Sequence, residues 1–387
     1  MNKVLLIGYR PGLERAIRRL GYDPVIVLQK MKPGLEGLDI ILVRSIESPE
    51  EVLGAVLRRH PVGDFAAAVT GHEQGVFTTL VARLALNLPG DKDLGRSLVF
   101  RDKHLQKMHL GDSVAHAESV PIELTDTYHC LSRQLGQRFF VKPSSGFGSD
   151  GVKLVESASD FEAALPGIAS SFQYLAESRV VGPEFHVDGV WWDDSVLWLS
   201  LARYLDSPYK CNDDGIMADH IVTEVMNSAL FTHAEELVGN ALSALQAPNG
   251  VFHLEAFISE CGLVLGEIAI RPPGGHVPEI INLTYGVDLF EAHVQAALEQ
   301  RPSINARVVD PSPVFGFVYL RRFPGSQLSI DFYRQNFQNI CQIELADSPT
   351  GGGAYNRDGF AIVQAASESH LQAAMLELVE VNGADRG

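Results

Sequence analysis

The segment from Val251 to Gly275 limits the possible folds of this chain more than any other part of the sequence. It reads VFHLEAFISECGLVLGEIAIRPPGG, and its two largely apolar runs have the pattern of paired strands. The residues between them, Glu260-Cys261-Gly262, fit a three-residue hairpin loop, which commonly ends on a glycine with left-handed backbone. The register predicted from this loop pairs Ser259 with Leu263, Phe257 with Leu265, and Glu255 with Glu267.

This register places the carboxylates of Glu255 and Glu267 opposite each other on one face of the hairpin, with Cβ atoms about 5 Å apart. Like charges in that position destabilise a sheet, whereas a divalent cation between them turns the repulsion into attraction. Mg²⁺ suits one or two carboxylates combined with phosphate oxygens. The alternative is a pair of surface glutamates on an exposed ribbon, but the flanking residues are too apolar for that: Leu254, Phe257, Leu265, Ile268 and Ile270.

Arg271 lies on the same strand, four residues beyond Glu267, and therefore on the same face. The rise of a strand puts it about 13 Å further along. This distance matches the span of a polyphosphate or of a reacting carboxylate.

A glycine-rich sequence, Gly146–Gly151, matches the pattern GxGxxG. A dinucleotide fingerprint needs a helix after this loop, but Val152–Val155 alternates like a strand. A P-loop needs Gly-Lys-Ser or Gly-Lys-Thr at its end, and this loop continues as Val-Lys instead. A protein kinase has its lysine on the strand after the loop, and neither HRD nor DFG occurs in the sequence.

The remaining interpretation is a strand, a loop and a second strand, with Lys142 shortly before the loop. Several glycines allow backbone N–H groups to close over phosphates without steric conflict. Lys142 would then stand beside the phosphates as a point charge. The alternative is a flexible hairpin turn.

The N-terminal part of the chain alternates predicted strands with predicted helices, which is typical of a parallel α/β layer. Its predicted strands are Lys3–Gly8, Pro24–Leu28, Ile40–Val43 and Phe65–Val69. The rest of the chain has the pattern of an α+β protein. Within it, the polar stretch Asp206–Asp219 predicts an irregular loop.

Composition excludes several classes of protein. The formal net charge of −17 argues against a general nucleic-acid binder. The longest apolar runs, such as Val314–Leu320, are too short to cross a bilayer, and the N-terminal sequence does not predict a signal peptide. The four cysteines form no CxxC pair, so we expect a reduced cytoplasmic protein without a transition-metal site, whereas a hard cation held by carboxylates stays possible.

These motifs occur in an order and spacing that resembles the ATP-grasp superfamily, and within it the carboxylate–amine ligases of the L-amino-acid (dipeptide) ligase type. The resemblance covers nearly the whole chain. The matching segments are Arg101-Asp102-Lys103, Val141-Lys142-Pro143 with its glycine loop, Ala176–Glu184, Glu255, and Glu267–Gly275.

The resemblance implies ATP as cofactor and a role for each matched residue. Lys103 and Lys142 would contact the phosphates, together with the loop residues Ser144, Ser145, Gly146, Gly148 and Gly151. Glu177 would meet the adenine amino group, the backbone at Val180 would read the purine edge, and Glu184 would bind the ribose hydroxyls.

The resemblance also implies a role in metal binding for the two carboxylates of the hairpin. Glu255 and Glu267 would hold Mg²⁺, with Mn²⁺ as a possible substitute, and Arg271 would steady the transferred phosphoryl group and the acyl phosphate. Many members of the family carry an asparagine ligand two residues after the second glutamate, where this chain has Ala269. Metal binding would therefore rest on the two carboxylates.

The fold implied by the resemblance combines α/β and α+β parts. A Rossmann-like domain is expected at 1–95, and a central lid subdomain with the glycine loop at 96–175. An antiparallel-sheet subdomain with the metal site is expected at 176–300, followed by an appended α+β unit at 301–387.

The activity implied by the resemblance is formation of an amide bond between a small carboxylate and an amine, with amino acids as the expected substrates and with release of ADP and phosphate. ATP would phosphorylate the carboxylate because oxide is a poor leaving group, and the amine would then displace phosphate. Candidate substrate-binding residues are Glu73, which follows a predicted strand end, and Gly275 with His276, which follow the RPPG segment. The family often forms homodimers.

Two alternatives stay open. One is an ATP-grasp enzyme of purine or carboxylation metabolism. The other is an ATP-binding sensor or scaffold without catalysis, although the presence of Glu255, Glu267 and Arg271 argues against it.

Overall fold

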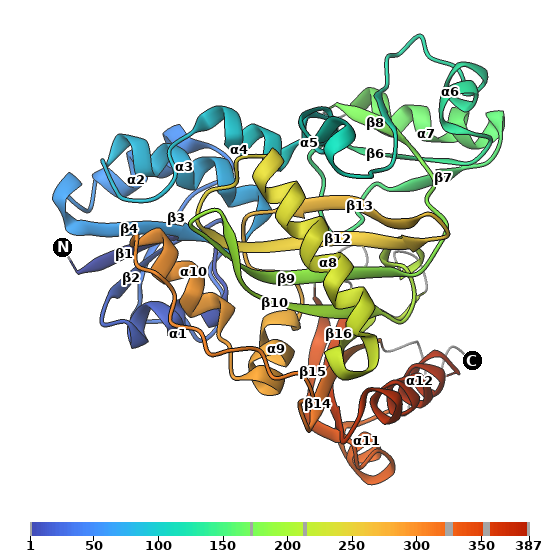
Figure 1. Cartoon of the computed structure of the whole chain (residues 1–387). Coiled ribbons are helices and arrows are strands. Elements are labelled where there is room, and N and C mark those ends of the chain that lie inside the picture. Colours follow the sequence, from blue (N-terminus) through green and yellow to red (C-terminus); the bar gives the residue numbers. More distant parts are fainter. Residues whose placement is uncertain (1, 171–172, 212–214, 322–327, 351–356, 385–387) are drawn as a thin grey trace.

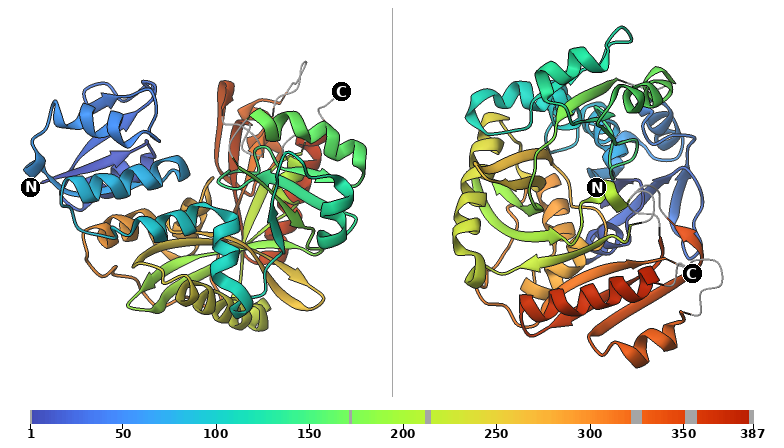
Figure 2. Two further views of the ribbon diagram at one scale, coloured as in Figure 1. Left: turned by 90° about the horizontal axis from the view of Figure 1, so that it is seen from above. Right: turned by 90° about the vertical axis from the view of Figure 1, so that its right-hand side faces the viewer.

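The computed structural model describes residues 2–170, 173–211, 215–321, 328–350 and 357–384. Three sheets organise these residues, namely a parallel sheet of four strands near the N-terminus, a second sheet of four strands, and a large sheet of eight strands. Figure 1 shows the N-terminal unit and the second small sheet toward different ends of the large sheet. The two views in Figure 2 show the same arrangement.

The N-terminal sheet has the order β3-β2-β1-β4, and all its strands are parallel. Its strands are β1 (Lys3–Ile7), β2 (Asp23–Leu28), β3 (Asp39–Leu42) and β4 (Phe65–Thr70). Helices α2 (Pro49–Leu57) and α3 (Val76–Ala85) follow β3 and β4, and α1 (Pro11–Arg19) follows β1. The predicted parallel α/β layer is confirmed.

One face of this sheet packs against a helix from much later in the chain. Helix α10 (Leu289–Ala297) contributes Phe290 and Val294 to the core that α1 fills with Leu13 and Ile17. The ring of Phe290 occupies the space beside Gly12, where a Cβ would lie 2.1 Å from it. This close approach requires glycine at position 12. The N-terminal unit is therefore anchored to the C-terminal half.

The second small sheet, called the lid here, has the order β5-β8-β6-β7. Its strands are β5 (Ser119–Pro121), β6 (Phe139–Pro143), β7 (Lys153–Val155) and β8 (Tyr174–Ser178), and its helices are α6 (Tyr128–Leu135) and α7 (Ala158–Ser170). Phe139, Val141 and Phe161 lie in its core. The expected boundary between residues 175 and 176 falls within β8.

Two helices lead from the N-terminal unit to the lid, α4 (Leu94–Arg101) and α5 (Lys103–Leu110). Asp102 separates them, because its extended backbone ends α4 and its carboxylate accepts hydrogen bonds from the N–H groups of His104 and Leu105. Lys103 is thereby fixed at the first position of α5.

The large sheet has the order β13-β12-β9-β10-β11-β14-β16-β15, and its neighbouring strands are antiparallel. Its strands are β9 (Glu184–Trp192), β10 (Ser195–Tyr204), β11 (Ala218–Val222), β12 (Gly250–Ser259), β13 (Gly262–Ala269), β14 (Val314–Leu320), β15 (Ile340–Thr350) and β16 (Arg357–Ala365). Residues 301–387, expected as an appended unit, thus contribute three strands to the same sheet.

Helices cover both faces of the large sheet. Helix α8 (Glu224–Ala244) packs on β9, β10, β12 and β13 through residues such as Phe231 and Val238, and Figure 1 shows it crossing these strands. The remaining helices are α9 (Val277–Tyr285), α11 (Ile330–Asn336) and α12 (Glu368–Ala384). Strand β11 begins inside the predicted loop Asp206–Asp219, and residues 212–214 of that stretch lie outside the described residues.

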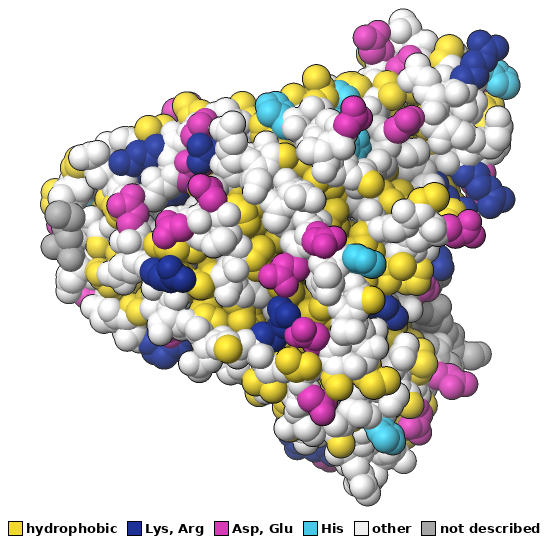
Figure 3. Space-filling view, in the orientation of Figure 1, with side chains coloured by type: hydrophobic (Ala, Val, Ile, Leu, Met, Phe, Trp, Pro, Cys, Tyr) yellow, Lys and Arg dark blue, Asp and Glu magenta, His cyan; other side chains and the backbone are white. Residues whose placement is uncertain are grey.

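On the face seen in Figure 3, Lys and Arg side chains are scattered among acidic and apolar ones. None of the helices in the described ranges combines the length and the apolar character needed to cross a bilayer.

Candidate functional site

A cavity of about 220 Å³ lies between the lid and the large sheet. Its wall comes from the end of β6, the glycine loop, the connection from β8 to β9, and the hairpin of β12 and β13. Most of the predicted site residues line it: Lys103, Lys142, Gly146, Gly148, Glu177, Val180, Glu184, Glu255 and Glu267. Thus the structure gathers residues that are up to 164 positions apart in the sequence (from Lys103 to Glu267) around one cavity.

The hairpin pairs Glu255 with Glu267, as the sequence predicted. The other predicted pairs are wrong, because Ser259 pairs with Gly262 and Phe257 pairs with Val264. The turn is one residue shorter than expected, and a β-bulge beside Glu255 restores the register.

Gly266 is the extra residue of this bulge, since Ala256 pairs with Leu265 and the next residue, Glu255, pairs with Glu267. A Cβ on Gly266 would lie 3.1 Å from the carbonyl oxygen of Glu255, closer than side chains normally approach. The absence of a side chain at this position therefore helps the two carboxylates to face each other.

Lys103 connects the hairpin to the glycine loop. Its Nζ lies 2.7 Å from Oε2 of Glu267 and donates a hydrogen bond of 2.7 Å to the carbonyl oxygen of Gly146. Burial raises the pKa of the Glu267 carboxyl, but the Lys103 and Lys142 charges outweigh it and lower that pKa to about 2. Glu267 is consequently an anion beside a cation at neutral pH.

Lys142, at the end of β6, forms an ion pair with Glu177 of β8, with Nζ 2.6 Å from Oε1. The other carboxylate oxygen pairs with Lys107, a buried residue of α5 that the sequence reasoning missed. Burial and the charge of Lys103 lower the pKa of Lys142 to about 8. The signal for Lys107 was its position four residues after Lys103, which puts both on one face of a helix.

Glu184 begins β9 at another part of the cavity wall. Its Oε2 accepts a hydrogen bond of 2.5 Å from the hydroxyl of Ser207. Burial and the nearby Glu255 charge raise the pKa of Glu184 to about 8, so this carboxyl is largely protonated at neutral pH.

The glycine loop has the backbone that its glycines permit. Gly148 and Gly151 have φ angles of 61° and 74°, which are left-handed values that favour glycine. Ser144 is buried, and its carbonyl oxygen accepts a hydrogen bond of 2.9 Å from the N–H of Lys103. The start of the loop is therefore fixed to the start of α5.

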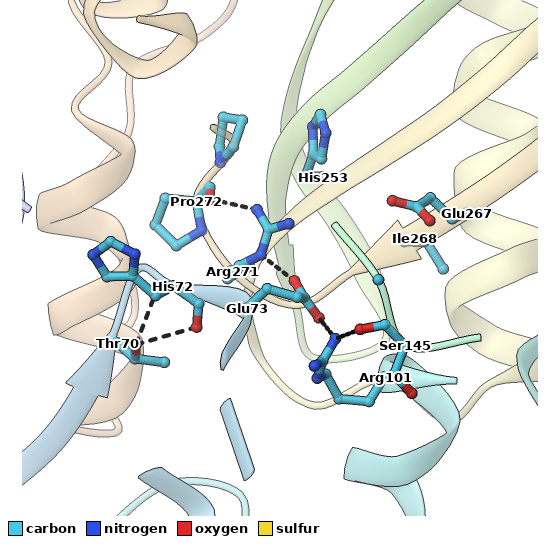
Figure 4. A network of polar contacts seen from close by, with 12 residues as sticks. Thr70, His72, Glu73, Arg101, Ser145, His253, Glu267, Ile268, Arg271 and Pro272 are labelled. Atoms are coloured by element: carbon cyan, nitrogen blue, oxygen red, sulfur yellow. Dashed lines mark hydrogen bonds and ion pairs between the residues drawn. The ribbon is translucent and has the colours of Figure 1, made fainter. Parts of the chain in front are cut away.

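Glu73 lies between two arginines (Figure 4). Its Oε2 pairs with Nε of Arg271, and its Oε1 lies 3.3 Å from Nη1 of Arg101. Arg101 also donates a hydrogen bond of 2.7 Å to the carbonyl oxygen of Ser145. Glu73 of the N-terminal unit thus contacts Arg271 with one oxygen and Arg101 with the other. Through Arg101, it is connected to the start of the glycine loop.

Gly275 and His276 lie directly before α9, outside the residues that line the cavity. The carbonyl oxygen of Gly275 accepts a hydrogen bond of 3.5 Å from Arg10 of the N-terminal unit. The ring of His276 stacks on Phe360 with a centroid distance of 3.8 Å. Burial, with the charges of Arg357 and Arg10, lowers the pKa of His276 to about 3, so its ring is neutral at pH 7.

A chain of buried acids and histidines lies on the same face of the large sheet as Glu255, and the sequence reasoning did not find it. It runs from Asp219 through His186, Asp188 and His253 to Glu255. The available signal was the two-residue spacing of polar residues within apolar strands, His186 with Asp188 and His253 with Glu255, since residues at that spacing share one face.

The residues present fit a hard divalent cation at the hairpin. Two carboxylates face each other there, and an ammonium group already lies against one of them. Oxygen ligands without cysteine suit Mg²⁺ or Mn²⁺. Ala269, two residues after Glu267 on β13, offers no further ligand.

Comparisons with known proteins bear on the fold of the chain. No family model matches the chain. An L-arginine-specific L-amino acid ligase from Bacillus subtilis is 22% identical over 258 residues, which is 64% of this chain and 62% of the ligase. The crystal structure of an L-amino acid ligase from Bacillus licheniformis gives a TM-score of 0.79 at 18% identity and covers 99% of this chain and 98% of that chain.

A carboxyaminoimidazole ribonucleotide synthase from Aspergillus clavatus, crystallised with ATP, also gives a TM-score of 0.79, at 19% identity, and covers 100% of this chain and 99% of that chain. These structural likenesses extend over the full chain, whereas the chain spans less than two thirds of the curated Bacillus subtilis relative. The ATP-grasp fold predicted from the sequence is confirmed.

Proposed function

We propose that this ATP-grasp protein is an ATP-dependent carboxylate–amine ligase that forms an amide or peptide bond through an acyl phosphate. The main observation behind this proposal is the facing pair of Glu255 and Glu267, beside Lys103 and Lys142, in one cavity under a glycine loop. The names of the two similar amino acid ligases support amino acids as substrates.

In the proposed reaction, the γ-phosphoryl group of ATP passes to the substrate carboxylate, so the bond between the γ-phosphorus and the bridging oxygen breaks and ADP leaves. The amine then attacks the acyl carbon, phosphate leaves, and the amine nitrogen loses a proton. Such transfers depend on positioning and charge neutralisation more than on covalent catalysis by the protein.

The residues of this chain have distinct roles in that proposal. Lys103 and Lys142 bind the phosphates and give up their present carboxylate partners, Glu267 and Glu177. Glu177 then turns toward the adenine, and Glu184 toward the ribose. Arg271 stabilises the charge on the transferred phosphoryl group.

Glu255 and Glu267 would hold Mg²⁺, which neutralises charge on the β- and γ-phosphates when it is bound. Their positions on two hydrogen-bonded strands keep the carboxylates at a fixed spacing. The glycine loop excludes water, which would otherwise hydrolyse the acyl phosphate.

A screen of amino-acid pairs tests this function, with phosphate release as the first readout and mass detection of the product as the second. We expect ADP, phosphate and a dipeptide for at least one pair. Formation of AMP and pyrophosphate would contradict the proposal. Glu255→Gln should lower the rate about 10³-fold, a loss typical of removing transition-state charge stabilisation, whereas Glu260→Gln, on the exposed turn of the same hairpin, should not.

A second candidate is an enzyme that joins bicarbonate or formate to a ribonucleotide. The likeness in fold to a carboxyaminoimidazole ribonucleotide synthase supports it. An ADP assay with bicarbonate and an aminated ribonucleotide separates the two candidates. We also propose that the protein forms a homodimer, as its resemblance to the ATP-grasp superfamily implies, and light scattering would test this.

A further inference from the structure

Glu255 is held by two side chains from the large sheet. The hydroxyl of Tyr204 donates a hydrogen bond of 3.2 Å to Oε1, and Nε2 of His253 lies 3.4 Å from the same oxygen. Both contacts therefore concern one oxygen of the carboxylate. Two contacts to Oε1 restrict the rotation of the Glu255 carboxylate, and they therefore also determine where Oε2 points.

His253 is in turn held by the chain of buried side chains behind it. Its Nδ1 lies 2.7 Å from Oδ1 of Asp188, and Oδ2 of Asp188 lies 2.5 Å from Nδ1 of His186. Nε2 of His186 lies 2.8 Å from Oδ2 of Asp219. His186, Asp188 and Asp219 have no solvent-exposed surface, and 6% of His253 is exposed.

These residues come from strands β9, β11 and β12, whose positions the sheet hydrogen bonds fix. Oδ1 of Asp219 has no hydrogen-bond partner among the described residues, but both ring nitrogens of His186 and both carboxylate oxygens of Asp188 are paired. Rotation of either side chain would leave a buried polar atom unsatisfied, so this part of the network has one preferred geometry. The ring of His253 therefore has one orientation, with Nε2 toward Glu255.

We propose that His253 is a positioning residue for Glu255, and that Asp188, His186 and Asp219 hold its ring in the orientation this needs. The inference rests on the proposed function, because Glu255 acts there as a ligand of the divalent cation. Groups that orient a metal ligand typically change metal affinity or activity 10- to 100-fold when they are lost.

The composition of the opposite strand supports this role. Ala269 is the partner of His253 in the register of β12 and β13, so the neighbouring strand offers no polar side chain at this level. The polar contacts of the His253 ring are therefore with Asp188 of β9 and with Glu255 of its own strand.

The same donors could instead hold a transition metal, since ligand atoms of His186, Asp188 and His253 lie within 4.8 Å of one another. The contacts from Asp219 through His186 and Asp188 to His253 measure 2.5 to 2.8 Å, which are hydrogen-bond lengths. Two ligands about 2.1 Å from one tetrahedral ion are about 3.4 Å apart. The distances therefore favour a hydrogen-bonded chain.

The test uses Mn²⁺ and a non-hydrolysable ATP analogue, with electron paramagnetic resonance to measure the metal bound to the protein–nucleotide complex. His253→Asn keeps an amide near Asp188 but is too short to reach Glu255, whereas His253→Gln can place its amide near the position of Nε2. We expect the Kd for Mn²⁺ to rise about 10-fold or more in H253N and to stay within about threefold of the wild-type value in H253Q.

His220→Asn is the matched control, because His220 is a buried histidine of β11 and, being next to Asp219, faces the other side of the strand. It should leave the Kd for Mn²⁺ unchanged, and thermal unfolding of all three variants reports on folding. Equal Mn²⁺ affinity in H253N and wild type would overturn the inference.

Three other outcomes distinguish the proposals. Metal analysis of the purified wild-type protein that finds one zinc per chain, lost in Asp188→Asn, would replace the hydrogen-bonded chain by a metal site. If the wild-type protein binds neither Mn²⁺ nor the analogue, the proposed function and this inference both fail. If it binds both but ligates no amino acids, only the substrate proposal fails, because the role of His253 is measured by binding.

Discussion

The ammonium group of Lys103 lies 2.7 Å from Oε2 of Glu267 and at the same distance from the carbonyl oxygen of Gly146. One side chain thus connects the hairpin with the glycine loop. Because these partners belong to the two walls of the cavity, phosphates that enter between them compete for the same cation. Nucleotide binding and release of the loop are therefore expected to be linked through Lys103.

Lys103→Met should raise the KM for ATP about 10- to 100-fold, the loss expected for one charge-assisted hydrogen bond. The KM values for the two other substrates should change much less. Steady-state kinetics with each substrate varied in turn measure this. Lys153→Met, at an exposed position on β7 of the lid, is the control, and a variant K103M with an unchanged KM for ATP would refute the role of this residue.

ATP affinity should fall as the pH rises above about 8. The pKa of Lys142 is lowered to about 8, so its ammonium group is present below this pH and lost above it. The Kd for ATP should then rise by up to tenfold per pH unit between pH 8 and 9.5. Calorimetric titrations across this range measure the effect.

Lys142→Arg separates this effect from other titrations. Arginine keeps its charge over the whole range, so the Kd of the K142R variant should vary little between pH 8 and 9.5. The same rise in both proteins would mean that another group is responsible.

Glu73→Gln should lower kcat/KM about 10- to 100-fold for every amine substrate. The substitution removes the charge between Arg101 and Arg271, and loss of a hydrogen bond between charged groups has about this effect. If Glu73 instead reads the amine, only the KM for the amine should rise. Glu51→Gln, which breaks a carboxylate–arginine pair at the surface of the same unit, serves as control.

Glu184→Gln should stabilise the fold at alkaline pH. The pKa of Glu184 is raised from 4.5 to about 8, so the folded state binds more protons than the unfolded state between these values, and stability falls as the pH rises through this range. The glutamine side chain does not titrate, so the stability of this variant does not fall with pH for this reason. Its Tm should match the wild-type value near pH 5 and exceed it by about 2 °C or more at pH 8.5.

Differential scanning calorimetry at both pH values checks this, with Glu162→Gln on the lid as an exposed control. A Tm difference that is constant from pH 5 to pH 8.5 would mean that Glu184 does not titrate as its burial indicates.

The sequence predicted the parallel N-terminal sheet and the facing glutamates because both depend on local patterns. The hairpin illustrates the limit of such patterns. Its turn has two residues between the paired Ser259 and Gly262 instead of three, and Gly266 adds a bulge, so two local errors cancel at Glu255. A glycine that forms a bulge cannot be distinguished by sequence pattern from one that merely occurs in a strand.

Other parts of the site depend on contacts between distant segments. Lys107 belongs to the site only because α5 lies against the lid, where Glu177 is located. Asp219 lies in a stretch whose polar composition predicts a loop, although it is the second residue of strand β11. Its partners in the register, Tyr204 of β10 and Phe317 of β14, are 15 and 98 residues away in the sequence. Tertiary packing decides both cases, and local composition carries no information about it.

The large sheet continues without interruption from β13, which carries Glu267, to β15 near the C-terminus. The glutamates and the C-terminal strands therefore belong to one continuous sheet, and opening or closing of the cavity would require movement of the lid. Deletion of the C-terminal strands would do more than shorten the molecule. It would leave the edge of β11 unpaired, and an unpaired edge of this kind invites aggregation.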